Sequence, residues 1–307
     1  MSDISTPVTI ALCTYNGAAH LPAQLQSYLD QRDVDWRLWV SDDGSTDVTR
    51  DILKNFAQRH DTERDIRIVD GPRGGFCANF MSLLCHPDFP AGPVALSDQD
   101  DVWLPHKLAR ARDQMKGQTG PAIYGAQSLH VDSRLRPIGR SSTAGSLPSF
   151  GNALVQNIVS GHSCVLSDEA LALVRSAGVP QGLPYHDWWL YMLITGAGGQ
   201  ATVDDETVLM YRQHGENLMG AHDGWQAKFT RARQVLGSEY GSWITANTRA
   251  LTQCSDLLNA PARAVLADFL TPARGLARAA QLHRLGIKRQ GRIGTACLYT
   301  AAALGHV

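Results

Sequence analysis

Short apolar runs alternate with segments of helical spacing along the first hundred residues of the chain. Each run lacks a helical period and ends near polar or glycine residues, which is typical of a buried strand. Residues 20–31, between the first two runs, carry apolar side chains at helical spacing. This alternation requires right-handed crossovers, so the sequence predicts an α/β fold with a doubly wound, mostly parallel sheet flanked by helices. The four runs are residues 8–13, 36–40, 66–69 and 93–96.

A polar cluster directly follows three of the four predicted strands. In open α/β sheets, ligands bind beyond the carboxyl ends of the strands. The three clusters are therefore expected to lie together at one ligand site. They are Thr14-Tyr15-Asn16, Asp42-Asp43-Gly44-Ser45 and Asp98-Gln99-Asp100-Asp101.

The last of these clusters places three carboxylates within four residues. Their mutual repulsion favours a bound cation. Hard oxygen ligands suit Mg²⁺ or Mn²⁺, which usually also bind substrate phosphates. The alternative is a solvated acidic turn before the helix at Pro105, but a position directly after a buried strand favours the metal.

Asp43 follows the second predicted strand and could accept hydrogen bonds from a nucleotide base or a ribose. The alternative is a helix cap. Ser45 and Asp47 can already fill that role, so we favour ligand contact for Asp43.

Two later segments carry further candidates for chemistry. Asp187 stands before an aromatic helix start, where an Asp is usually the N-cap. Gly161 follows a predicted strand at 155–159; it could let the backbone approach a donor sugar, or form a plain tight turn. Trp188 and Trp189 favour the core, because aromatic side chains bury large areas, although either could pack against a sugar ring.

Composition excludes several other classes of protein. A formal net charge of −1 gives no indication of a nucleic-acid partner. The six cysteines are scattered, which indicates free thiols in a reducing compartment and argues against disulfides or a zinc site. Neither a signal peptide nor an apolar run long enough to span a bilayer is apparent. We therefore expect a cytoplasmic protein, either free or at the inner face of the membrane.

Four segments together resemble the signatures of family 2 glycosyltransferases, whose fold is called GT-A. The Gln of the acidic cluster and the fourth segment are similar to those of the rhamnosyltransferase-like branch of that family. The resemblance covers roughly residues 7–220. The segments are Cys13-Thr14-Tyr15-Asn16-Gly17, Ser41-Asp42-Asp43-Gly44-Ser45-Thr46-Asp47, Asp98-Gln99-Asp100-Asp101 and Tyr211-Arg212-Gln213-His214-Gly215-Glu216-Asn217.

The resemblance implies a role for each matching position. Asp187 matches the catalytic base, although His186 replaces the usual acidic neighbour. Asp100 matches the ligand of an Mg²⁺ or Mn²⁺ ion that bridges two phosphates, His214 a residue that reaches the metal or the diphosphate, and Asp101 a residue that orients the turn. Contacts to the donor nucleotide fall on Cys13, Thr14, Tyr15, Asn16, Asp43, Gly75, Asn79, Asp98 and Gln99. Contacts to the donor or acceptor sugar fall on Gly161, His162, His186, Trp188 and Arg212.

The activity implied by the resemblance is metal-dependent, inverting transfer of a sugar from a UDP- or dTDP-sugar. The acceptor would be a hydroxyl of a glycan or lipid-linked molecule in cell-surface polysaccharide synthesis, and rhamnose is the leading donor sugar. A sugar-phosphate nucleotidyltransferase would need a glycine-rich loop with Arg and Lys where this chain has Thr14-Tyr15-Asn16-Gly17. A non-catalytic sugar-nucleotide-binding protein would be expected to lack Asp100, Asp187 or His214, all of which are present.

The chain is predicted to divide into a GT-A catalytic domain at 1–220 and a C-terminal helical region at 221–307. Within the catalytic domain, about 7–103 would bind the nucleotide and about 104–220 would form the acceptor side.

Two segments outside the motifs carry expectations of their own. Residues 133–151, rich in Ser, Gly, Arg and Pro, are expected to form a long loop. Residues 282–304 combine basic side chains with an apolar stretch. That tail could lie on an anionic membrane face, pack against a second subunit in a homodimer, or pack back on the catalytic domain.

Overall fold

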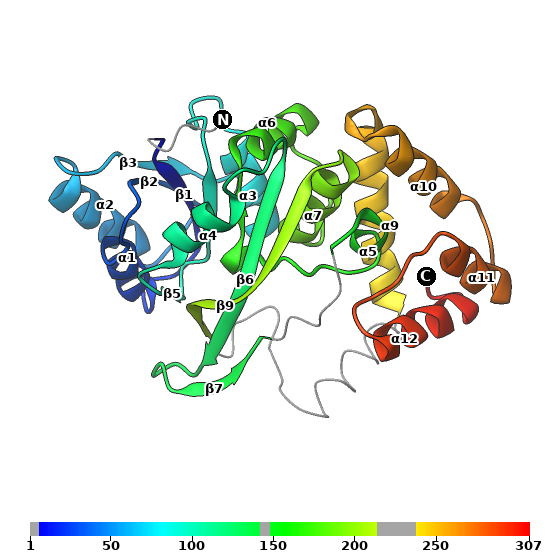
Figure 1. Ribbon diagram of the computed structural model, residues 1–307. Helices are drawn as coiled ribbons and strands as arrows, with labels where there is room; N and C mark the ends of the chain where they lie inside the picture. Colours follow the sequence, from blue (N-terminus) through cyan, green and yellow to red (C-terminus); the bar gives the residue numbers. More distant parts are fainter. Residues whose placement is uncertain (1–5, 142–147, 214–237) are drawn as a thin grey trace.

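The structure is a computed structural model that describes residues 6–141, 148–213 and 238–307. One sheet runs through the molecule, with helices on both of its faces and four further helices at the C-terminal end (Figure 1). The strand order is β3-β2-β1-β4-β8-β6-β9-β5, and β7 pairs with β6 outside this path.

The first half of the sheet follows the predicted alternation. β1, β2, β3 and β4 pair in parallel, and the register sets Thr14 opposite Asp42 at the carboxyl ends of β1 and β2. Every residue of β1 and β4 is buried, as expected for continuous apolar runs covered on both faces. The elements are β1 (Val8–Thr14), α1 (Leu21–Leu29), β2 (Trp36–Asp42), α2 (Thr49–His60), β3 (Ile66–Asp70), α3 (Phe76–Leu84) and β4 (Val94–Ser97).

The second half of the sheet mixes directions. β6 and β9 pair in parallel over a long ladder, whereas β8 joins β4 to β6 through short antiparallel pairings. Each parallel ladder is longer than any antiparallel one, so the prediction of a mostly parallel sheet is confirmed. The elements are β5 (Val102–Trp103), α4 (Lys107–Met115), β6 (Ala122–Val131), β7 (Pro137–Arg140), α5 (Phe150–Ala153), the 3₁₀ turn η1 (Gly161–Ser163), β8 (Val165–Leu166), α6 (Asp168–Ala177), α7 (His186–Gly196) and β9 (Gln200–Arg212).

The expected loop at 133–151 needs a correction. β7 pairs with the end of β6 as a hairpin, and α5 begins at Phe150. Pairing with β6 satisfies backbone groups that a free loop would leave to water. Residues 142–147, in the middle of this segment, lie outside the described residues.

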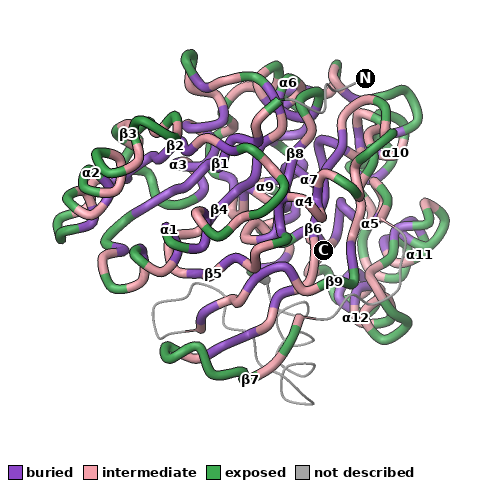
Figure 2. The backbone as a smooth tube through the Cα atoms, turned by 60° about the vertical axis from the view of Figure 1, so that its left-hand side comes forward, coloured by how far each residue is buried: buried purple, intermediate pink, exposed green. Residues whose placement is uncertain are grey.

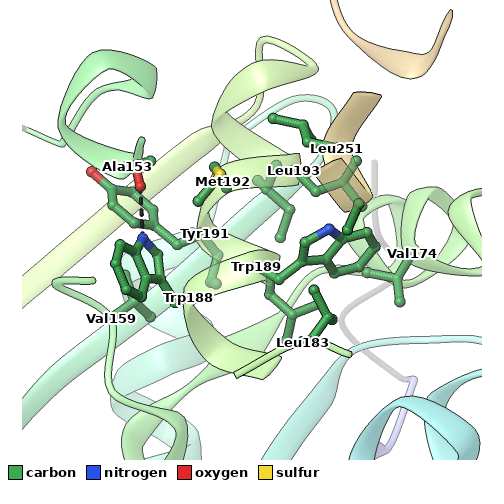
Figure 3. Close-up of a cluster of buried hydrophobic side chains, with 14 of the residues drawn as sticks. Ala153, Val159, Val174, Leu183, Trp188, Trp189, Tyr191, Met192, Leu193 and Leu251 are labelled. Atoms are coloured by element: carbon green, nitrogen blue, oxygen red, sulfur yellow. Dashed lines mark hydrogen bonds between the residues drawn. The ribbon is translucent and has the colours of Figure 1, made fainter. Parts of the chain in front are cut away.

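Helix α7 occupies the centre of the molecule. It contacts β6 and β9 on the sheet and also α3, α5, α6 and α9. Its residues from Trp188 to Ile194 are all buried, which is the pattern of a helix surrounded by protein on every side. Figure 3 shows these side chains packed among Val159, Val174 and Leu251.

The C-terminal helices pack back on the part of the molecule that contains the sheet. Helix α12 buries Leu298, Ala301 and Ala302 in the same hydrophobic cluster as α7, and Figure 2 shows the buried tube continuing into this region. In the described part of the chain, no helix has the length and apolar character needed to cross a bilayer. The elements are α9 (Ser238–Gln253), η2 (Ser255–Leu257), α10 (Ala260–Leu270), α11 (Leu276–Arg284) and α12 (Arg292–Ala303).

Candidate active site

The carboxyl ends of β1, β2 and β4 are joined by side-chain hydrogen bonds. Thr14 Oγ1 donates to Asp42 Oδ2 over 2.9 Å. The Gln99 side-chain amide accepts from Tyr15 N–H and donates to Tyr15 C=O, both over 2.9 Å. The three predicted polar clusters therefore meet at one edge of the sheet, as expected. The Gln99 amide thus holds the backbone of the loop after β1 in place.

Asp43 organises the loop between β3 and α3. Its carboxylate accepts from Arg73 N–H at 2.6 Å and from Gly75 N–H at 2.8 Å. Asn79 of α3 links this helix to β2, because its Nδ2 donates to Ser41 C=O over 3.0 Å. The buried Asn79 amide thus supports the loop from within.

Tyr15, Asn16 and Gly75 are the exposed residues among the expected donor contacts. Tyr15 is 57% exposed. Gly75 has φ of 84°, a left-handed conformation that favours glycine, and nothing lies within 4 Å of a Cβ built there. Cys13 is buried, and its thiol pKa is raised by burial and by the charges of Asp98 and Asp43. Cys13 is therefore a buried thiol in the electrostatic environment of these two carboxylates.

The acidic cluster divides into two half-buried carboxylates and one fully buried carboxylate. Asp98 and Asp100 are half-buried, whereas Asp101 has no exposed surface. Asp101 Oδ1 accepts from Arg212 N–H over 3.2 Å. Arg212 also donates from Nε to Asp100 C=O at 2.9 Å and from Nη1 to Ser133 C=O at 2.7 Å. The end of β9 thus holds the acidic turn in place.

Asp98, Asp101 and His162 each offer one ligand atom, and these three atoms lie within 4.8 Å of one another. Asp101 Oδ2 and His162 Nε2 are buried and have no hydrogen-bond partner. Burial lowers the pKa of His162 to about 3, with Lys107 and His130 acting in the same direction. Its imidazole is therefore neutral, which is the form that binds metals. Two carboxylates and a neutral imidazole with unused buried atoms fit a divalent cation.

This group differs from the metal ligands implied by the resemblance. Asp100 is not a member, whereas Asp101, expected only to orient the turn, and His162, expected to contact a sugar, are. His214 lies outside the described residues.

Charge is concentrated around the cluster. Burial raises the pKa of Asp98 to about 7, and Asp100 and Asp187 act in the same direction, while Lys107 opposes them. The pKa of Asp101 is raised well above its usual range, first by burial and then by Asp100 and Asp98. A bound cation would favour the ionised form of both carboxylates.

Asp187 reaches this site from the first turn of α7. Its Oδ2 accepts from Gly161 N–H and its Oδ1 from Trp188 N–H, both over 2.8 Å. A Cβ built on Gly161 would lie only 3.0 Å from His186 Nε2, so the close approach favours glycine. Because Asp187 raises the pKa of Asp98, the two carboxylates share one electrostatic environment. The structure therefore brings the expected base and the expected glycine turn together beside the acidic cluster.

Trp188 is not placed where a sugar could reach it, which corrects that expectation. Its side chain is buried, and its Nε1 donates to Ala153 C=O over 2.7 Å (Figure 3). Its ring stacks on Tyr240 of α9. His186 is also buried and stacks on Phe80 with ring centroids 4.1 Å apart. Both rings therefore support the start of α7 from inside.

Lys107 was not among the residues that the sequence indicated. It begins α4, is fully buried, and its Nζ donates to His162 C=O over 2.6 Å. Burial lowers its pKa to about 7, against the raising effect of Asp101 and Asp98. The sequence carried one indication that Lys107 is buried. It stands four residues before Ala111, so the two residues share one face of α4, and the helix buries that face.

The family model for glycosyl transferase family 2 matches residues 9–171. The dTDP-rhamnosyl transferase RfbG of Shigella flexneri is 27% identical over 258 residues, covering 81% of this chain and 87% of that protein. The putative teichuronic acid biosynthesis glycosyltransferase TuaG of Bacillus subtilis is 22% identical over 58% of this chain and 69% of its own length.

Solved structures share the fold at low sequence identity. Residues 1–349 of TarS from S. aureus, in complex with UDP-GlcNAc, align with a TM-score of 0.55 at 13% identity, over 97% of this chain and 90% of that one. The mannosyltransferase PcManGT from Pyrobaculum calidifontis, in complex with GDP-Man and Mn²⁺, aligns with a TM-score of 0.54 at 18% identity, over 100% and 89% of the two chains. Because the family model matches more than half of the chain, this protein belongs to glycosyltransferase family 2 and is a nucleotide-sugar-dependent glycosyltransferase with the GT-A fold.

Proposed function

We propose that the protein is a metal-dependent, inverting glycosyltransferase that moves rhamnose from dTDP-rhamnose to a hydroxyl group. The observation that carries the proposal is the meeting of three sets of groups at one sheet edge. These are the nucleotide-side loops after β1 and β2, the Asp98–Asp101–His162 group, and the Asp187 carboxylate.

The donor assignment rests on the likeness to the S. flexneri dTDP-rhamnosyl transferase, which extends over most of both chains. On the protein side, the exposed Tyr15 ring offers a stacking surface for a base. The loop that Asp43 holds brings the open backbone at Gly75 to the same side. These features favour a bound nucleotide along the ends of β1 and β2.

The proposed cofactor is Mg²⁺ or Mn²⁺, held by Asp98, Asp101 and His162. Asp100 stands beside this group, and together with His214 it stays a candidate ligand from the family resemblance. When bound, the ion would offset the negative charge of the departing nucleoside diphosphate. Arg212 contributes by fixing the backbone of the cluster from β9.

Asp187 is the proposed general base. An acceptor hydroxyl has too high a pKa to attack at neutral pH unless its proton is accepted as the bond forms. Asp187 Oδ1 and Oδ2 each accept a backbone N–H, which fixes the carboxylate and leaves further lone pairs for a substrate proton. The proton moves to the Asp187 carboxylate while the acceptor oxygen bonds to the anomeric carbon. The bond to the nucleoside diphosphate breaks on the opposite face, which inverts the configuration.

Cell-surface polysaccharide synthesis is the proposed setting, and the acceptor a glycan or lipid-linked molecule. The likeness to a putative teichuronic acid glycosyltransferase favours this setting. Exposed Leu276 and Ile293, with the basic residues Lys288 and Arg292, are compatible with contact between the C-terminal helices and the inner face of an anionic membrane, or with a homodimer. Co-sedimentation with anionic vesicles and light scattering separate these two arrangements, and a monomer that leaves vesicles unbound contradicts both.

A donor panel tests the central proposal. Purified protein is incubated with dTDP-rhamnose, other dTDP-sugars, UDP-sugars and GDP-mannose, with Mn²⁺ or with a chelator, and nucleoside diphosphate release is measured. We expect release from dTDP-rhamnose to stop on chelation and to return with added metal. Release from another sugar nucleotide in place of dTDP-rhamnose would overturn the donor assignment, and full activity under chelation would overturn the metal.

A further inference from the structure

Lys107 is a buried cation that no step of the proposed mechanism uses. It has no exposed surface, although a lysine is almost never fully buried unless it is paired. Its Nζ lies over the ring of Trp103 in β5, 3.5 Å from the ring centroid. The position is therefore built by two neighbouring elements, β5 and α4, which directly follow the acidic cluster in the chain.

The ammonium group of Lys107 joins two segments that are far apart in the sequence. Nζ donates over 2.6 Å to the carbonyl of His162, in the η1 turn 55 residues later. Lys107 also interacts electrostatically with Asp101 and Asp98. One side chain thus contacts the turn that carries His162 and interacts with the two carboxylates whose ligand atoms lie within 4.8 Å of a ligand atom of His162.

Other bonds hold the residues on either side of His162. Ser163 N–H and Oγ both donate to Ser160 C=O over 3.0 Å, and Ser163 Oγ accepts from Ala126 N–H over 3.1 Å. Asp187 holds Gly161 N–H, and the His162 ring stacks on Tyr211 with centroids 4.6 Å apart. Nε2 of His162 itself is buried without a hydrogen-bond partner. Because ring orientation depends on the backbone of this turn, the bond to the His162 carbonyl acts directly on the direction of Nε2.

We propose that Lys107 is a positioning residue that holds His162 Nε2 and the Asp98 and Asp101 carboxylates in the arrangement that receives a divalent cation. The inference deepens the proposed function, because it rests on the metal site proposed there. Lys107 itself is not a ligand, since a lysine ammonium has donors and no acceptor. It supplies a hydrogen bond to the backbone of the turn that carries His162.

The test compares Mn²⁺ binding by wild-type protein, Lys107→Met and Lys107→Gln, without donor or acceptor. Free Mn²⁺ is followed by electron paramagnetic resonance at one fixed pH. Met fills the same space without the charge or the donor, whereas Gln retains a donor on a shorter stem. We expect Lys107→Met to weaken Mn²⁺ binding by about 10- to 100-fold, the range seen when groups that orient metal ligands are removed. Lys107→Gln should fall between Lys107→Met and wild type.

Leu108→Ala is the matched control for lost stability. Leu108 is the next residue of α4, is buried, and packs in a hydrophobic cluster with residues of α1, β1 and β2. We expect it to lower the melting temperature and to leave Mn²⁺ affinity unchanged. A parallel loss of affinity in Leu108→Ala would reduce the Lys107 effect to general destabilisation and overturn the proposal.

The remaining outcomes are also decisive. Wild-type protein that binds no Mn²⁺ would refute the proposed metal site itself. Wild-type binding together with unchanged affinity in folded Lys107→Met would refute only the role of Lys107. If Lys107→Met does not fold, unchanged affinity in folded Lys107→Gln would refute that role in the same way.

Discussion

The proposed nucleotide side and the proposed acceptor side of the site are built in different ways. On the nucleotide side, the clusters after β1, β2 and β4 stand at the ends of adjacent parallel strands and bond to one another. On the acceptor side, Asp187, His162 and Lys107 come from α7, η1 and α4, which are distant in the chain. The first arrangement follows from strand order, whereas the second depends on how the helices pack.

This difference shows that site residues and core residues can be hard to distinguish from the sequence. Asp187 and Trp188 are neighbours at the start of α7, yet the carboxylate faces the site and the indole enters the core. A helix that is buried all round needs large apolar groups on every face, even directly beside a polar site. Aromatic residues next to a catalytic candidate are therefore weak indicators of ligand contact.

The largest expected effect comes from the acceptor side. Asp187→Asn should lower the rate of rhamnose transfer or donor hydrolysis by about 100- to 10,000-fold, because the amide cannot accept the proton. Binding of dTDP, measured by calorimetry, should stay close to wild type. Asp51→Asn, at an exposed carboxylate on α2, serves as the control. Near-normal turnover in Asp187→Asn would show that Asp187 is not the base. The two sides of the site would then no longer differ in this respect.

The division between site and core at α7 predicts a stability effect without a binding effect. Trp188→Ala should lower the free energy of unfolding by about 3–5 kcal/mol, as expected for deletion of a buried Trp. Trp188→Phe, which keeps a ring but leaves Ala153 C=O without its donor, should cost about 1–3 kcal/mol. Urea unfolding measures both. Unchanged stability together with a raised KM would instead restore Trp188 as a sugar contact.

The smallest expected effect comes from the nucleotide side. Tyr15→Ala should raise the KM for the donor about two- to tenfold, corresponding to the loss of one stacking contact, and should leave kcat nearly unchanged. Tyr15→Phe keeps the ring and should resemble wild type. Steady-state kinetics with the donor varied gives the result. A kcat loss as large as that of Asp187→Asn would show that Tyr15 acts in the chemical step.

The features that could be predicted from the sequence lie mainly on the nucleotide side of the proposed site. The four parallel strands and the polar clusters at their ends were predicted, because apolar runs and strand-end positions are local properties. The contact between Gly161 and Asp187 was not predicted, because it joins residues 26 positions apart in two different elements. The short strand β7 was missed, because four mostly exposed residues paired on one edge carry little pattern of their own.

The sequence by itself determined the doubly wound half of the sheet, the edge at which the ligand site lies, and the acid-rich character of that edge. Only the tertiary structure decided which acid meets which partner. Asp101 accepts a hydrogen bond from the end of β9 and lies near His162. Lys107 donates to the His162 carbonyl, and the Trp188 side chain lies in the core. The physical reason is that strand position follows from short-range patterns, whereas these contacts join residues that are tens of positions apart and arise from the packing of whole elements.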